Sequence, residues 1–166
     1  MDSWLLRGII MSVINIAARI LLGFAVIAWP IQSPIYRAIA IAAIVLIAVI
    51  WGGYDGIKDA RAHPDPDDYD DLTMRWLKAG FLAGWTSCLI CWILGTYWLD
   101  GIGQASFWIE MIAGTSFITL LVYVPAFFGV SAGRFLVRRE QRKGEDTDWS
   151  HHELHTQPTE VVQTGA

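Results

Sequence analysis

The chain has 166 residues, of which 54% are hydrophobic and 17% charged, and its mean hydropathy is +0.41. A soluble domain carries nearer a quarter charged residues, so this composition excludes an ordinary water-soluble protein. The formal net charge of −4 gives no basic footprint for nucleic acid. Residues 38–50 read AIAIAAIVLIAVI, without one polar side chain, which indicates an integral membrane protein.

Four apolar segments are each about 20 residues long, which matches the ~30 Å hydrocarbon thickness of a bilayer at 1.5 Å per residue. They cover about residues 9–29, 36–54, 79–98 and 107–129. The first and second segments are joined by a short link, as are the third and fourth, so each pair forms antiparallel neighbours. The sequence therefore predicts an all-α, polytopic membrane protein with one four-helix transmembrane domain over residues 1–137.

Lysine and arginine are distributed unevenly around these spans. One side holds the basic residues of the N-terminus, of the link over 55–78 and of the region after the fourth span, whereas the other side holds only Arg37. By the positive-inside rule, both termini and the 55–78 link are predicted to lie in the cytoplasm, with the protein in the cell's inner (plasma) membrane. Residues 138–166 are polar and lack apolar periodicity, so we expect a disordered cytoplasmic tail.

The first span carries a polar face that includes Asn15 and Arg19. A charge at the centre of a bilayer costs about 2.5–3.5 kcal/mol on insertion scales, so Arg19 marks a candidate functional site. We expect Asn15 to hydrogen-bond Arg19 and Glu110 to be its acidic partner, with hydroxyl groups of the fourth span as neutral alternatives. Arg19 would either lock the first and fourth helices together or serve transport or partner docking. The neutral alternatives are Thr115, Ser116 and Thr119.

Rows of small residues mark the predicted helix–helix contact faces of three spans, because small side chains let helix backbones approach closely in lipid. The sequence CLIC belongs to such a row, and no His or third Cys lies at membrane depth to complete a zinc shell. The second span shows no comparable face. The small residues are Gly8 and Gly23 in the first span, Gly80, Gly84, Cys88, Cys91 and Gly95 in the third, and Gly129 and Gly133 in the fourth.

An acidic stretch, HPDPDDYDD, occupies residues 63–71 of the link. It contains a DDxxD but has prolines upstream and no second acidic motif, and an EF-hand would need Gly and Glu where Asp70 and Trp76 stand. Neither a metal nor a cofactor is therefore expected. We predict an acidic cytoplasmic hairpin in which Asp70 or Asp71 caps the third helix. The other acids, Asp65, Asp67 and Asp68, would either dock on a basic partner surface or stay solvated.

The chain resembles an actinobacterial family of small four-helix membrane proteins that is distantly related to drug/metabolite transporters. The resemblance rests on RILLGFAVIAWPIQSP, VLIAVIWGGYDGIKDARAHPDPDDYDDLTMRWLKA, WILGTYWLDGIGQ and FFGVSAGRFL, and covers about residues 5–137. It implies an accessory subunit of the Mce (mammalian cell entry) lipid importer, which packs beside the permease helices among membrane lipids and is not an enzyme. The alternative is an autonomous small transporter that acts as a homodimer, although such exporters use a membrane-embedded acid in the first helix, where this chain has Arg19.

Overall fold

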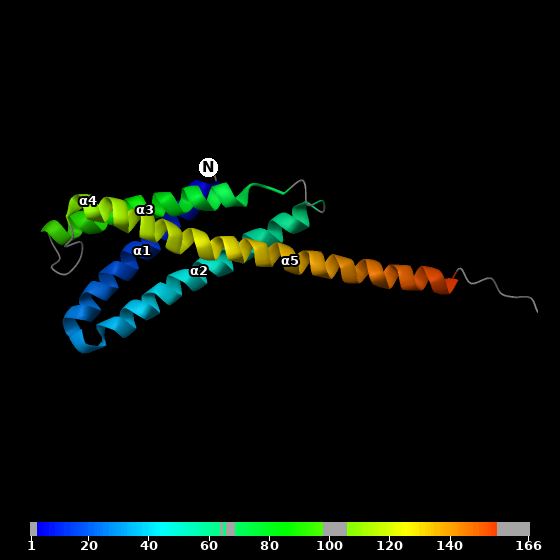
Figure 1. Ribbon diagram of the computed structural model, residues 1–166, viewed down its shortest axis with the longest axis horizontal. Coiled ribbons are helices and arrows are strands. Elements are labelled where there is room, and N and C mark those ends of the chain that lie inside the picture. The colour runs from blue at the N-terminus through cyan, green and yellow to red at the C-terminus, as the bar shows by residue number, and fades with distance from the viewer. Residues whose placement is uncertain (1–2, 64, 66–68, 98–105, 156–166) are drawn as a thin grey trace, which may run out of the picture.

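The computed structural model describes residues 3–63, 65, 69–97 and 106–155, and within these residues the regular structure is helical (Figure 1). Helix α1 runs over Ser3–Ala28 and is followed by a 3₁₀ turn, Pro30–Gln32. Helix α2 spans Ser33–Ala62, and α3 spans Leu72–Tyr97. A last helical rod consists of α4 (Phe107–Ile109), a π-helical turn labelled η3 (Glu110–Gly114) and α5 (Thr115–His155).

Four of these helical segments are long and apolar enough to cross a membrane, which confirms the predicted all-α, four-span architecture. They are Trp4–Ala28, Pro30–Ala62, Leu72–Tyr97 and Phe107–Lys143. The segments extend past the apolar runs of the sequence because the polar residues that follow continue the same helices. Helix α2, for example, ends only at Ala62, where the His63 N–H donates to the Asp59 carbonyl at 3.0 Å just before Pro64.

The prediction of a disordered tail from residue 138 is wrong over residues 138–155, because α5 continues to His155. This stretch is rich in Arg, Glu, Gln and Lys, which favour helix. It also extends a helix that is already formed, so no new nucleation is needed. Residues 156–166 lie outside the described residues.

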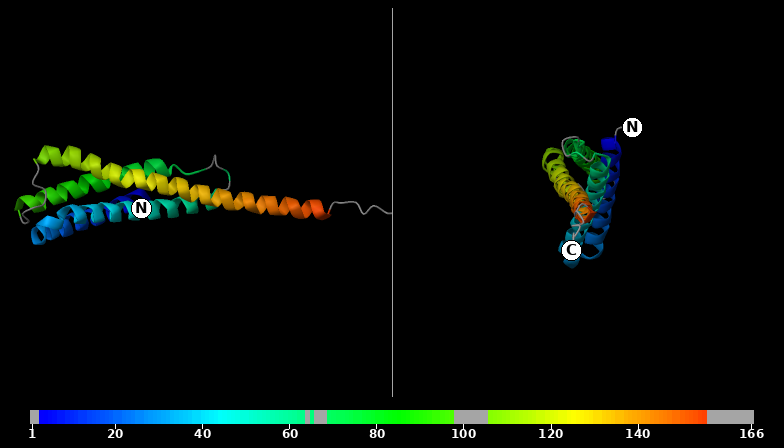
Figure 2. Two further views of the ribbon diagram at one scale, coloured as in Figure 1. Left: turned by 60° about the horizontal axis from the view of Figure 1, so that its bottom comes forward. Right: turned by 90° about the vertical axis from the view of Figure 1, so that its right-hand side faces the viewer.

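The four long helices form a bundle in which α1 packs against α3, α3 against α5, and α5 against α2, whereas α1 and α2 touch only narrowly. The hairpin of α1 and α2 diverges from α3 and α4 at the end where it turns (Figures 1 and 2). At the opposite end the helices converge around Trp76, whose ring lies 6.0 Å from that of Trp51 in an edge-to-face arrangement. Trp76 is 1% exposed, so it belongs to the core.

Helix α2 does carry a contact face, contrary to the sequence interpretation, and it meets α5 at glycines on both helices. A Cβ atom added to Gly52 or Gly56 would lie 2.9 Å from an α5 Cα atom, a separation that real Cβ atoms essentially never show. On α5, a Cβ atom at Gly129 or Gly133 would meet the backbone of α2 in the same way. Two small-xxx-small pairs thus face each other and let the backbones touch.

Candidate functional site: an intramembrane ion pair and its cleft

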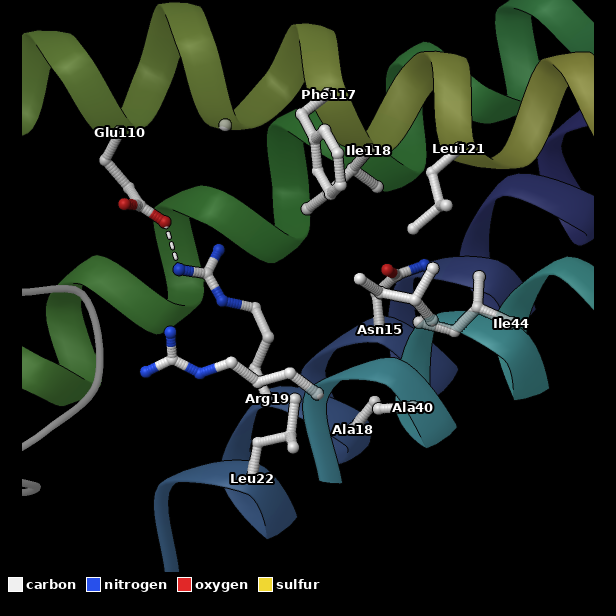
Figure 3. A pocket seen from close by; sticks show the side chains of 13 residues that line it. Asn15, Ala18, Arg19, Leu22, Ala40, Ile44, Glu110, Phe117, Ile118 and Leu121 are labelled. Atoms are coloured by element: carbon white, nitrogen blue, oxygen red, sulfur yellow. Dashed lines mark hydrogen bonds and ion pairs between the residues drawn. The ribbon is translucent and has the colours of Figure 1, made fainter. Parts of the chain in front are cut away.

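Arg19 of α1 forms an ion pair with Glu110, as the sequence predicts, and this pair joins the two hairpins at membrane depth. The guanidinium Nη2 donates to Glu110 Oε1 (Figure 3), and Nη1 also lies 3.6 Å from the Cys88 sulfur of α3. The Arg19 side chain is 27% exposed and that of Glu110 is 10% exposed. Arg19 therefore carries its counter-charge within the chain and connects three elements.

Glu110 owes its position to the π-helical turn η3, of which it is the first residue. A π turn inserts an extra residue into a helix and often marks a functional position. The turn also brings Gly114 against α3, where an added Cβ atom would lie 2.8 Å from the Cys88 sulfur. The acid and its partner were predicted from the sequence, whereas the π-helical turn was not.

Asn15 does not bond Arg19, which corrects the predicted role of this amide. Its Nδ2 donates to the Met11 carbonyl one turn earlier in α1, at 2.9 Å, and the residue is 2% exposed. The amide is thus satisfied by its own helix. Among the proposed neutral partners, Ser116 and Thr119 likewise bond carbonyl groups within their own helical rod.

A cleft of about 370 Å³ opens beside the ion pair, between the diverging α1–α2 hairpin and the η3–α5 rod. Its walls are mainly apolar, and the polar residues that line it include Asn15 and Arg19 from α1 and Glu110 from the facing rod (Figure 3). A second hollow of about 290 Å³, between α1 and α2, shares four lining residues with it. The shared residues are Ala18, Leu22, Ala40 and Ile44.

The predicted small-residue row of α3 faces the last rod. An added Cβ atom would lie 3.1 Å from the Thr119 carbonyl at Gly80 and 2.7 Å from the Thr115 carbonyl at Gly84. The row continues through Cys88 and Cys91, which are both buried free thiols, and ends at the half-exposed Gly95.

The first-helix glycines lie on the side of the α1–α3 contact or close to the hairpin turn. At Gly8, an added Cβ atom would lie 2.7 Å from a Leu82 methyl group and 3.2 Å from the Ala79 carbonyl, so this glycine sits where α1 meets α3. Gly23 is buried in the last turns of α1.

A polar cluster at the opposite end of the bundle was missed from the sequence. Arg7 Nε donates to Asp55 at 2.7 Å, which ties α1 to α2. Arg134 donates to the Asp59 carboxylate through Nε at 3.0 Å, which ties α5 to α2, and also to the Asp70 carbonyl at 2.8 Å. Both aspartates of α2 are 7% exposed. Asp55 and Asp59 are four residues apart, and each follows one of the contact glycines, Gly52 and Gly56, by three residues. This spacing places all four on one face of α2 and could have revealed that face from the sequence.

The acidic link supplies a cap for α3 and an ion pair to Arg75. The Met74 N–H donates to Asp71 Oδ1 at 3.0 Å, the geometry of an N-cap for α3. Asp70 does not cap the helix but pairs with Arg75 at 2.9 Å, and its N–H donates to Asp59. Asp65 is exposed. Asp67 and Asp68, proposed with it as docking residues, lie outside the described residues.

No protein-family model matches the chain, and no curated protein is significantly similar to it. Within residues 3–63, 65, 69–97 and 106–155, no three His, Cys, Asp or Glu side chains gather as a metal site would require. The described site is thus an internally neutralised ion pair at the edge of an apolar cleft.

Proposed function

We propose that this chain is a non-catalytic subunit of a larger lipid-transport complex of the Mce type in the inner membrane. In this proposal both termini are cytoplasmic, and the transmembrane helices pack beside the permease. The family resemblance, which extends to the mycobacterial lipid-uptake coordinator, suggests the lipid-transport setting. The structural feature that supports a subunit role is the long projecting end of α5.

Helix α5 projects well beyond the other helices (Figure 1), and its 41 residues correspond to a rod of about 60 Å. Among the α5 residues whose side chains the structure describes, Val137 is the last buried one, and residues 138–143 are exposed. A helix that is polar on every side and has no packed face is stabilised by bridging to another body or by its own side-chain pairs. We infer that this end of α5 is an arm that docks on a partner subunit.

The ion pair favours this role over an autonomous cation exporter. Such an exporter needs a membrane-embedded acid that exchanges a proton for a cationic substrate. The acid at depth in this chain is Glu110, and its charge is already neutralised by Arg19. Proton exchange at Glu110 would leave the Arg19 charge unpaired in the membrane, which is costly.

The test is co-purification in mild detergent followed by mass spectrometry, comparing the full chain with one that ends after Lys143. We expect the full chain to recover permease subunits of a lipid importer and the shortened chain to lose them. The control is the thermal transition of the two proteins, which should agree because the shortened chain keeps the buried core residues through Val137. Recovery of only further copies of this chain, together with transport by the reconstituted protein, would contradict the proposal.

The acidic link offers a second point of attachment. If Asp65, Asp67 and Asp68 dock on a basic partner, their joint replacement by Asn should loosen that partner more at low than at high ionic strength, since salt screens exposed charges. Equal recovery at both salt concentrations would assign the link no docking role.

A further inference from the structure

The cleft beside Arg19 and Glu110 has a net positive charge. Two arginines, Arg19 and Arg37, and one acid, Glu110, line it. Glu110 is already paired with Arg19. Arg37 is exposed and forms no ion pair or hydrogen bond with any residue that the structure describes. One positive charge is therefore left for an anion.

The charge and the apolar walls are arranged in the order that an amphiphile needs. Arg37 is the fifth residue of α2, roughly 6 Å along the helix axis from its start. Ile41 and Ile44 follow it down the same helix, and Phe117 and Leu121 line the wall of α5 (Figure 3 labels three of these four). An anionic head at Arg37 would thus leave an acyl chain running inward over apolar side chains.

The volume limits the size of this occupant. At about 370 Å³ the cleft lies near the lower end of the ~300–1,000 Å³ range of ligand sites, which suits one acyl chain better than a two-chain lipid. The adjoining apolar hollow between α1 and α2 gives that chain further room beyond Ile44.

We propose that the cleft binds one long-chain fatty acid, with its carboxylate held by Arg37 and its chain lying between α2 and α5. A guanidinium recognises a carboxylate by charge-assisted hydrogen bonds. The site is a property of this chain alone and does not depend on the subunit role, so the two can fail separately.

The experiment uses the purified full chain in nanodiscs of phosphatidylcholine at alkaline pH, because the bilayer raises the pKa of a fatty-acid carboxyl above its ordinary value of about 4. A palmitic acid that carries a photoreactive diazirine is compared with its methyl ester, which has the same chain and no charge. Labelled residues are located by mass spectrometry. We expect the acid to label the cleft walls of α2 and α5 about ten-fold more than the ester, the effect of one charge-assisted hydrogen bond on an equilibrium constant.

Two variants and two matched controls test the assignment. Arg37→Gln should reduce labelling by the acid about ten-fold, to the level of the ester, whereas Arg61→Gln, an exposed arginine at the other end of α2, should not. Ala40→Trp fills the region shared by both hollows and should abolish labelling of the cleft, whereas Ala42→Trp on the exposed side of α2 should not.

Equal labelling by acid and ester would overturn the proposal, because the cleft would then hold bulk lipid without selection for charge. Unchanged labelling of Arg37→Gln would overturn it as well. Displacement of the probe by phosphatidic acid at lower concentration than by unlabelled palmitate would assign the cleft to a phospholipid and refute the fatty-acid site.

Discussion

The glycine contact between α2 and α5 offers a sharp test because two neighbouring glycines of α2 differ in what they face. At Gly56, an added Cβ atom would lie 2.9 Å from the Val130 Cα atom and 3.0 Å from its carbonyl carbon. At Gly53, the nearest atom is the Gly129 carbonyl oxygen at 3.6 Å, an ordinary van der Waals distance. The change to Ala is identical in both, yet only one forces the helices apart.

The expected difference follows from this geometry. Both substitutions gain the same helix propensity, up to about 1 kcal/mol by measurements in water, so the propensity cancels in the comparison. Overpacking a close contact costs about 1–3 kcal/mol when the backbone must shift. We therefore expect Gly56→Ala to lower the free energy of unfolding by about 1–3 kcal/mol relative to Gly53→Ala, which is roughly a 5- to 150-fold change in the folded-to-unfolded ratio.

The assay is equilibrium unfolding in mixed micelles of dodecyl maltoside and dodecyl sulfate, followed by tryptophan fluorescence. Trp51 and Trp76 lie near this contact, with ring centroids 6.0 Å apart, so they report on its separation. Equal stabilities for the two variants would refute the close approach of α2 and α5. Gly129→Ala, whose added Cβ atom would lie 2.9 Å from the Gly53 nitrogen, should show the same loss from the α5 side of the contact.

Three further predictions concern polar contacts. Glu110→Gln should destabilise the protein by about 3 kcal/mol in the same unfolding assay, because it leaves Arg19 charged without a partner, whereas adding Arg19→Leu should restore most of the loss. Additive losses in the double variant would mean that the pair is not coupled. Asp59→Asn should cost a similar ~3 kcal/mol and resist salt, since its carboxylate is 5% exposed against Arg134; a loss that disappears in 1 M salt would place the pair in solvent. Asp71→Ala should cost about 1 kcal/mol at any ionic strength through loss of the α3 cap, and faster amide hydrogen exchange confined to the first turn of α3 would confirm this.

The sequence predicted those features that a single helix displays by itself. The four spans were identified from the length of their apolar runs. The partner of Arg19 was predicted because Glu110 was the one acid near membrane depth in the sequence. The row from Gly80 to Cys91 was visible because its members recur every three or four residues among bulky neighbours. In each case a pattern within one helix was enough to indicate the span, the ion pair or the contact face.

Features that depend on how two helices meet were not predicted. Gly52 lies near the end of the predicted second span and Gly56 just after it, and only the position of α5 shows that they form a close backbone contact. Asp55 and Asp59 were not singled out because their partners, Arg7 and Arg134, are 48 and 75 residues away in the chain. The π turn at Glu110 arises from packing of the rod against α3, where Gly114 meets Cys88, and the local sequence carries no mark of it.

The two ends of the bundle are held by opposite means, and this asymmetry explains why the cleft exists. At the end that includes the polar cluster, facing glycines of α2 and α5 bring the backbones into contact, and buried ion pairs at Asp55 and Asp59 fix the helices there. At the end where α1 turns into α2, this hairpin diverges from the rod (Figure 1), and the Arg19–Glu110 pair links the two. An arginine is the longest side chain that could make this bridge, so it joins the hairpins without drawing their backbones together. The separation that remains is lined by Ile41, Ile44 and Phe117, which are too bulky to let the helices close. Because Glu110 neutralises Arg19, Arg37 is the charged group that a ligand in the cleft would meet. The Arg19–Glu110 pair thus determines both the separation of the helices and the net charge of the cleft.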